Sequence, residues 1–221
     1  MSENLEKVKH TIPSHVKLVA VSKTKTVEKI LGIYNSGHKI FGENKVQELT
    51  TKFQALPQDI EWHMIGHLQT NKVRYIAPFV SIIHSVDSLK LLQVIDKEAK
   101  KNNRIIQCLF QIKIAKEITK YGLSVPEAHY ILESKDYKEL KNVQVTGLMG
   151  MATYTDDEGE TRKEFRTLAG VFKDIKNKYF STDKSFKELS MGMSHDYKIA
   201  IEEGSTIVRI GSLIFGERTY Y

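Results

Sequence analysis

Short apolar runs alternate with amphipathic helical segments along this chain, and this alternation constrains the fold more than any other feature. The apolar runs lie at residues 16–22, 38–41, 60–66, 80–86, 104–114, 143–151, 186–193 and 205–212. Most are rich in the β-branched and aromatic residues that strands favour, and segments with helical spacing of apolar residues separate them. No hairpin signal such as Asn-Gly joins two runs, so we expect the strands to be parallel.

Eight parallel strands with intervening helices usually close into a cylinder. The sequence therefore predicts the α/β class and a single (β/α)8 barrel of the TIM type, with an N-terminal helix before the first strand. A doubly wound open sheet is the alternative. Because no linker, low-complexity segment or identical repeat interrupts the pattern, residues 1–221 are predicted to form one domain.

Composition and charge argue against several classes of function. No run approaches the roughly 20 apolar residues of a membrane helix, and the first residues lack the apolar segment of a signal peptide. The one cysteine, Cys108, lies inside an apolar run, which predicts a buried thiol in a reducing compartment. The net charge of +6 comes from lysines interspersed with acids, which disfavours a nucleic-acid surface. We therefore expect a cytoplasmic protein that binds neither membrane nor nucleic acid.

A lysine follows directly on the first predicted strand, where a barrel of this kind places its chemistry. Lys23 is backed by apolar residues, and loss of hydration would disfavour its ammonium form and lower its pKa. A neutral amine attacks an aldehyde to give a Schiff base. A rim lysine that bonds a loop carboxylate is the alternative. Lys25 shares the same face by period-two alternation but lies beyond the expected strand end, so we expect it in solvent.

The last two predicted strands end in small polar residues that could bind an anion. Residues 190–194 read Ser-Met-Gly-Met-Ser before a helix, and residues 209–212 read Arg-Ile-Gly-Ser. Free amides and hydroxyls in such loops bind phosphate, and these barrels often hold phosphate after strands 7 and 8. Together with Lys23, the two loops predict a site for a phosphorylated aldehyde.

Two histidines have the spacing of zinc ligands. His63 and His67 are four residues apart, but Gly66 interrupts them and no third ligand lies nearby in the sequence. We therefore predict no metal site, with His63 hydrogen-bonded inside a strand and His67 at the rim. Glu43 and Asp196 are acids near the predicted site, where either could orient a loop lysine or cap a helix.

Six stretches, in order and over nearly the whole chain, closely resemble the pyridoxal-phosphate homeostasis proteins, which share the barrel of alanine racemase. They are AVSKTKT, FGENKVQE, WHMIGHLQTNK, GLMGMAT, LSMGMSHDYKIAIEEGST and VRIGSLIFGERTYY. The resemblance implies the cofactor pyridoxal 5′-phosphate (PLP), held by Lys23 as a Schiff base. It implies further cofactor contacts at Asn44, Met149, Ser190, Ser194, Arg209, Gly211 and Ser212. Lys45 and His195 depart from the pattern of many relatives but do not fall on these positions.

The resemblance also implies a role in PLP homeostasis and in amino-acid and keto-acid balance, without a dedicated substrate reaction. With Arg209 as its partner, the ring nitrogen of PLP would stay unprotonated and the cofactor would be a weaker electron sink. A rim cation paired with a carboxylate such as Glu217 is the alternative for Arg209.

Two enzymatic functions remain as alternatives. A small PLP-dependent amino-acid racemase would use Lys23 as one base, but alanine racemase takes its opposing tyrosine from a further β-domain. Tyr220 and Tyr221 stand in a short terminus that is a poor source of a rigid base. A Schiff-base aldolase would use the same lysine and phosphate loops. Because we expect no domain that completes a partner's site, we expect a monomer.

Overall fold

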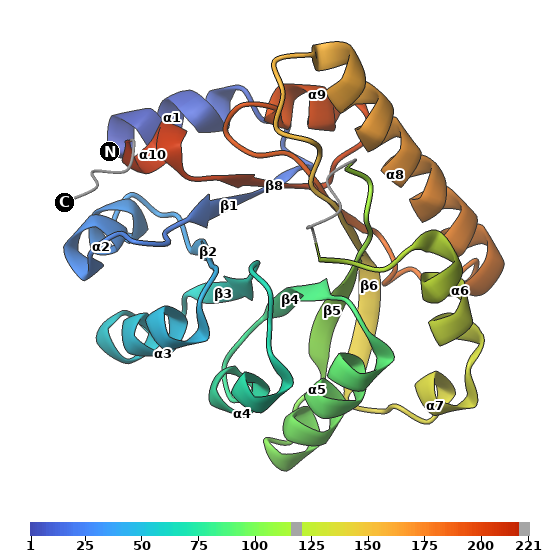
Figure 1. The fold of residues 1–221 in the computed structure, drawn as a ribbon. Coiled ribbons are helices and arrows are strands. Elements are labelled where there is room, and N and C mark those ends of the chain that lie inside the picture. Colours follow the sequence, from blue (N-terminus) through green and yellow to red (C-terminus); the bar gives the residue numbers. More distant parts are fainter. Residues whose placement is uncertain (116–120, 217–221) are drawn as a thin grey trace.

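The computed structural model describes residues 1–115 and 121–216, and within them eight parallel strands close into a barrel in the order β1-β2-β3-β4-β5-β6-β7-β8 (Figure 1). Strand β8 pairs with β1, which closes the cylinder. The strands are β1 (Lys17–Val21), β2 (Ile40–Glu43), β3 (Glu61–Met64), β4 (Ile82–Val86), β5 (Ile106–Gln111), β6 (Val143–Met149), β7 (Glu188–Ser190) and β8 (Ile207–Ile210).

Helices connect the strands and surround the barrel (Figure 1). They are α1 (Ser2–His10), α2 (Val27–Tyr34), α3 (Val46–Ala55), the 3-10 turn η1 (Thr70–Lys72), α4 (Val73–Ile76), α5 (Leu89–Lys101), α6 (Val125–Glu133), α7 (Lys135–Lys138), α8 (Glu158–Tyr179), α9 (Tyr197–Glu202) and α10 (Ser212–Phe215). Helix α1 precedes the first strand and packs beside α10. None of the helices in the described ranges is long and apolar enough to cross a membrane.

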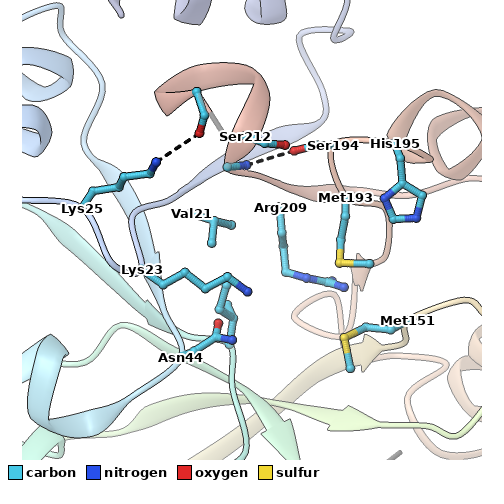
Figure 2. Close-up of a pocket in the computed structure, with 13 residues that line it drawn as sticks. Val21, Lys23, Lys25, Asn44, Met151, Met193, Ser194, His195, Arg209 and Ser212 are labelled. Atoms are coloured by element: carbon cyan, nitrogen blue, oxygen red, sulfur yellow. Dashed lines mark hydrogen bonds between the residues drawn. The ribbon is translucent and has the colours of Figure 1, made fainter. Parts of the chain in front are cut away.

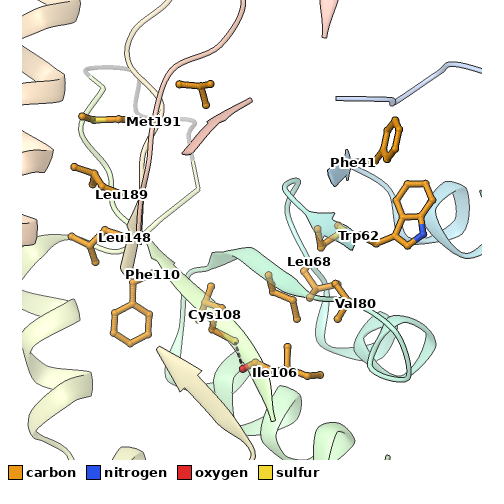
Figure 3. Packing of buried hydrophobic residues seen from close by; sticks show 14 of the residues in the cluster. Phe41, Trp62, Leu68, Val80, Ile106, Cys108, Phe110, Leu148, Leu189 and Met191 are labelled. Carbon is orange, nitrogen blue, oxygen red and sulfur yellow. Dashed lines mark hydrogen bonds between the residues drawn. The ribbon is translucent and has the colours of Figure 1, made fainter. Parts of the chain in front are cut away.

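Period-two alternation divides the side chains of each strand between two environments. In β1, Leu18 and Ala20 join the large apolar cluster between the strands and the helices, whereas Val19 points into the barrel. The barrel interior holds a small apolar cluster of Val19, Ile82, Leu109, Met149 and Ile207. Figure 3 shows part of the outer cluster, with Phe41 and Trp62 packed against each other and Cys108 in the same layer.

The predicted barrel and its N-terminal helix are confirmed, because every predicted run contains a strand in the expected order. Ser88 caps the N-terminus of helix α5, where its Oγ accepts a hydrogen bond from the amide of Leu91 at 3.2 Å. The short helices α7 and α10 were not predicted, because segments of four residues carry no periodicity that distinguishes a helix from a loop.

Candidate functional site

A pocket of about 270 Å³ opens at the carboxyl ends of the strands (Figure 2). Its walls come from the ends of β1 and β8, from the loops after β1, β2, β3, β6 and β7, and from both ends of α10. The lining residues are Val21, Lys23, Lys25, Asn44, Ile65, Met151, Met193, Ser194, His195, Arg209, Gly211, Ser212 and Gly216. Figure 2 shows the Lys23 amine and the Arg209 guanidinium pointing into the same space.

The loop that carries Lys23 is held by backbone hydrogen bonds at both ends. The amide of Ser22 donates to the carbonyl of Gly42 at 3.0 Å, and the amide of Lys25 donates to the carbonyl of Ser22 at 3.0 Å. Between them Thr24 has a φ of 65°, a left-handed conformation that is unfavourable for a β-branched residue. Its amide donates to Glu48 Oε1 at 2.5 Å. Lys23 is therefore presented by a tight turn that a carboxylate on α3 fixes in place.

Four polar side chains beside this loop form what we call the Lys52 cluster: Ser22, Glu43, Glu48 and Lys52. Lys52 Nζ lies 2.7 Å from Glu43 Oε1, 2.6 Å from Glu48 Oε1 and 2.7 Å from the carbonyl of Ser22. Ser22 Oγ donates to Glu43 Oε1 at 2.5 Å. Burial raises the pKa of Glu43 to about 7, although Lys52 and Ser22 oppose that rise. Glu43 does not line the pocket. It acts through Lys52 and Ser22, which hold the loop that carries Lys23 from the helix side.

The loop after β7 forms the opposite wall of the pocket. Gly192 has a φ of 94°, and a Cβ there would lie 2.6 Å from the Cβ of Ala200, so the loop requires glycine at this position. Asp196 Oδ1 accepts the amide of Met193 at 2.5 Å, and Asp196 Oδ2 lies 3.2 Å from His195 Nε2. Ser194 Oγ accepts the amide of Gly211 at 3.3 Å, which ties this loop to the end of β8.

Arg209 lies on β8 with 4% of its surface exposed. Its Nη1 donates to Ser190 Oγ at 2.6 Å, and its Nη2 donates to the carbonyl of Gly150 at 3.1 Å. Burial lowers the pKa of Arg209 to about 10, and the nearby carboxylate of Asp196 opposes that shift. The guanidinium therefore remains charged at neutral pH while it lines the pocket.

Six of the eight residues predicted to contact a cofactor line this one pocket: Lys23, Asn44, Ser194, Arg209, Gly211 and Ser212. The other two do not line it. Met149 packs in the apolar interior of the barrel, and Ser190 is fully buried beneath Arg209. A direct cofactor contact by Met149 or Ser190 therefore stays a prediction. Met151 and Met193, which the sequence analysis did not single out, line the pocket (Figure 2).

Lys25 differs from its predicted place in solvent. Its side chain is partly buried, lines the pocket and donates to the carbonyl of Gly216 at 3.1 Å. The reason is that the β1–α2 turn folds over the barrel mouth, so a residue beyond the strand end can still face the opening. The other residues considered for roles here, Glu217, Tyr220 and Tyr221, lie outside the described residues.

The two histidines with zinc-like spacing point to different places, as expected. His63 lies in β3, where its Nδ1 is 3.0 Å from His84 Nε2 inside the barrel. His67 lies at the rim, 3.3 Å from Asp87 Oδ2 and stacked on Tyr121 with ring centroids 3.8 Å apart. No group of three or more His, Cys, Asp or Glu side chains that could hold a metal ion occurs in the part of the chain that the structure describes.

The arrangement combines three kinds of group in one small pocket: an amine that can bond a carbonyl carbon, a charged planar donor, and hydroxyls beside a backbone amide. Such a set suits a ligand that carries an aldehyde, a hydrogen-bond acceptor and an anionic group. Two apolar thioethers, from Met151 and Met193, border the same space and suit a flat ring (Figure 2).

Comparison with known proteins identifies the family. The family model "Alanine racemase, N-terminal domain" matches residues 1–219. The chain is 45% identical to the pyridoxal phosphate homeostasis protein of Aquifex aeolicus, over 92% of this chain and 88% of that protein.

One solved structure supports the same placement, and a second shares the fold. PipY of Synechococcus elongatus, solved with PLP bound, superimposes with a TM-score of 0.87 at 32% identity, over 97% of this chain and 99% of that chain. An alanine racemase of Clostridium difficile is 16% identical with a TM-score of 0.73, and the match covers 99% of this chain but 56% of that one. This second likeness shows the shared fold alone. The chain belongs to the alanine racemase N-terminal domain family and, within it, to the pyridoxal phosphate homeostasis proteins.

Proposed function

We propose that this chain binds PLP through a covalent bond to Lys23 and supports vitamin B6 homeostasis and amino-acid and keto-acid balance, without a dedicated substrate reaction. The observation that carries the proposal is the convergence of Lys23, Arg209 and the Ser194–Gly211 contact on one pocket (Figure 2). The names of the relatives at 38–45% identity and the PLP bound to PipY support the same choice of ligand.

The residues present fit the parts of PLP one by one. The Lys23 amine would form a C=N bond to the aldehyde carbon, and the carbonyl oxygen would leave as water. Arg209 has N–H groups beyond the two that Ser190 and Gly150 accept, and these would donate to the ring nitrogen. The hydroxyls of Ser194 and Ser212 and the amide of Gly211 would bind the phosphate. Asn44 lines the pocket next to Lys23 (Figure 2).

Arg209 supports a binding role over catalysis. PLP supplies an electron sink whose strength depends on protonation of its ring nitrogen. A guanidinium that stays charged at neutral pH donates a hydrogen bond to that nitrogen but does not give up its proton. The residue opposite the ring nitrogen therefore keeps the sink weak, which suits a protein that holds PLP in reserve.

The proposal is tested on the purified protein loaded with PLP. We expect the absorbance of an imine, trapping by borohydride, and attachment at Lys23 in the peptide map. Lys23→Ala should abolish all three, whereas Lys25→Ala should retain them. Attachment at Lys25 would overturn the choice of lysine, and a colourless protein that takes up no added PLP would overturn the proposal and favour an aldolase.

The racemase alternative is tested with the same loaded protein. Alanine and serine are incubated with it, and their optical rotation is followed. We expect no change in rotation above a control without protein. Turnover at enzymatic rates would overturn the binding-only role and would require a base opposite Lys23, for which His195 is a pocket-lining candidate.

The proposal also places the protein in the cytoplasm as a monomer of one domain, residues 1–221, that binds neither nucleic acid nor membrane. Three observations support this. The thiol of Cys108 is fully buried, as suits a reducing compartment. Outer lysines such as Lys7, Lys9 and Lys101 pair with acids of their own helices. One closed barrel accounts for all strands of the described ranges. Light scattering at several concentrations tests the monomer, and a doubled mass would contradict it.

A further inference from the structure

A chain of four buried polar side chains crosses the interior of the barrel, and we call it the Arg209 chain: Arg209, Ser190, His84 and His63. Arg209 Nη1 lies 2.6 Å from Ser190 Oγ, Ser190 Oγ lies 2.9 Å from His84 Nδ1, and His84 Nε2 lies 3.0 Å from His63 Nδ1. Each residue sits on a different strand, namely β8, β7, β4 and β3. All four are at most 4% exposed.

The direction of these hydrogen bonds follows from which atoms can donate. Arg209 has only donors, so Ser190 Oγ accepts from it. If the Ser190 hydroxyl donates to His84 Nδ1, then His84 Nε2 carries a proton and donates to His63 Nδ1. One group is then left without a partner among the described residues, the N–H at His63 Nε2.

The reverse direction leaves more groups unpaired. His63 Nδ1 would donate to His84 Nε2, and His84 Nδ1 would donate to Ser190 Oγ. The Ser190 proton would then have no acceptor, because the other recorded contact of its oxygen is the donor Arg209. His63 Nε2 would still lack a partner. A buried polar group without a partner costs about 1–3 kcal/mol, so the first direction is favoured.

Both histidines are neutral in this arrangement. Burial lowers the pKa of His63 to about 3, with a smaller effect of Lys17, and burial lowers the pKa of His84 well below its ordinary value. A hydroxyl that donates its proton becomes a better acceptor, because successive hydrogen bonds polarise one another. Ser190 Oγ is therefore a good hydrogen-bond acceptor for the guanidinium. The four residues of the Arg209 chain include no carboxylate that would pair with its charge.

We propose that Ser190, His84 and His63 are positioning residues that fix the orientation of Arg209 toward the ring nitrogen of PLP. They do so through a neutral, one-directional hydrogen-bond chain that takes no proton from the guanidinium and supplies none to the ring. The inference rests on the proposed function, because it assigns Arg209 to the ring of bound PLP. None of the three side chains lines the pocket, so their effect passes through Arg209.

The first test uses the protein without cofactor. Nitrogen-15 NMR of labelled histidines at neutral pH reports which ring nitrogen carries the proton. We expect His63 and His84 to be neutral and protonated at Nε2, with assignments from His63→Gln and His84→Gln variants. A proton at Nδ1 of either ring, or a charged ring, would overturn the proposed direction of the chain. This result does not depend on PLP, so it separates this inference from the proposed function.

The second test measures cofactor binding and its spectrum. Ser190→Ala removes the oxygen that holds Arg209, and we expect PLP to dissociate about tenfold faster and the absorbance band of the bound cofactor to shift. Ser190→Thr retains the hydroxyl and should restore both properties. The control is Thr146→Val, which removes a buried hydroxyl of the neighbouring strand β6 that has no hydrogen-bond partner in the described residues.

The outcomes of the second test are distinct. A folded Ser190→Ala protein with native release rate and native spectrum would overturn the positioning role. An equal effect of Thr146→Val would mean that any change in the barrel interior disturbs binding, and would overturn it as well. If Ser190→Ala does not fold, the tautomer measurement on the unaltered protein decides. If the unaltered protein binds no PLP, the proposed function fails while the assigned hydrogen-bond directions stand or fall on the NMR result.

Discussion

The Lys52 cluster and the Arg209 chain support the same pocket in different ways. The Lys52 cluster lies on the helix side of β1 and β2, contains three ionisable groups, and bonds the backbone of the loop that carries Lys23. The Arg209 chain lies inside the barrel, uses neutral histidines, and bonds the side chain of Arg209. A left-handed backbone turn is thus held in part by charged side chains, whereas the buried guanidinium is held by neutral acceptors.

The two groups should also respond to pH in opposite directions. Burial raises the pKa of Glu43 to about 7, so its contribution to stability is full at acidic pH and is lost as the pH rises toward 7. Burial lowers the pKa of His63 to about 3, so its contribution is full above its ordinary pKa of 6.5 and is lost as the pH falls. The comparison can therefore be tested by substitutions on each side.

The largest effect is expected for Lys52→Met. This change removes the cation that lies between the carboxyl groups of Glu43 and Glu48, and breaking a buried ion pair by removing one partner costs about 3–5 kcal/mol. Urea unfolding at neutral pH measures the loss. The control is Lys39→Met, which breaks a pair with Asp59 in which both side chains are about half exposed, and should cost less than about 1 kcal/mol. Equal losses in the two variants would contradict the assigned role of the Lys52 cluster.

His63→Gln tests the neutral chain. The pKa of His63 is about 3 in the folded protein and 6.5 in the unfolded protein. A fall from pH 7 to pH 5 therefore lowers the stability of the unaltered protein by about 2 kcal/mol. Glutamine keeps an acceptor for His84 but cannot take up a proton. We therefore expect the variant to lose about 2 kcal/mol less than the unaltered protein across this range, measured by urea unfolding at both pH values. A loss as steep as that of the unaltered protein would show that His63 does not titrate as a buried group.

Glu43→Gln should have an effect of similar size and opposite sign. The unaltered carboxyl gains a proton in the folded protein as the pH falls from 7 to 5, and this adds about 2 kcal/mol of stability. Glutamine cannot gain that proton, so the variant should lose about 2 kcal/mol more than the unaltered protein over the same range. The same unfolding series measures it. A smaller loss than that of the unaltered protein would mean that Lys52 keeps the Glu43 pKa at or below its ordinary value.

The sequence predicted the barrel well because each strand and each of the longer helices carries its own periodic signal. It also predicted that Lys23, Arg209 and the loops after β7 and β8 meet, because parallel strands bring their carboxyl ends to one edge. The sequence did not predict the Lys52 cluster or the Arg209 chain. Glu43, Glu48 and Lys52 are close in the sequence, but nothing there shows that they turn inward toward Ser22. The members of the Arg209 chain are far apart along the sequence, and a single histidine such as His84 inside an apolar run gives no sign of its partner. Alternate residues of β3, β4, β7 and β8 point into the barrel. This period-two pattern is the sequence signal that could have placed the members of the Arg209 chain near one another.

The misplacement of Lys25 has a different cause. Lys25 was predicted in solvent because it lies beyond the strand end, where period-two alternation no longer applies, and the left-handed Thr24 does end that regularity one residue after Lys23. Sequence patterns carry little information about such a turn, because threonine is not a residue that normally marks a positive φ. The position of Lys25 at the pocket therefore depends on a conformation that tertiary contacts impose.

The smallest effect is expected at Thr24 itself. A left-handed threonine costs about 1–2 kcal/mol, and Thr24→Gly relieves this but adds about 0.5–1 kcal/mol of chain entropy in the unfolded state. We expect a net stabilisation of about 0.5 kcal/mol, measured by urea unfolding. Asn103→Gly is the matched control, since Asn103 also has a positive φ, of 51°, but asparagine tolerates this conformation and should gain nothing from the change.

The same position tests whether Glu48 holds the strain. Glu48 Oε1 accepts the amide of Thr24, so Glu48→Gln should weaken the bond that keeps the turn left-handed. In a Thr24→Gly background the turn no longer needs that bond, and Glu48→Gln should cost about 0.5 kcal/mol less than in the unaltered protein. Additive losses would mean that the turn is fixed by its other bonds, those of Ser22 and Lys25, and that the charges of the Lys52 cluster stabilise the fold without shaping the loop that presents Lys23.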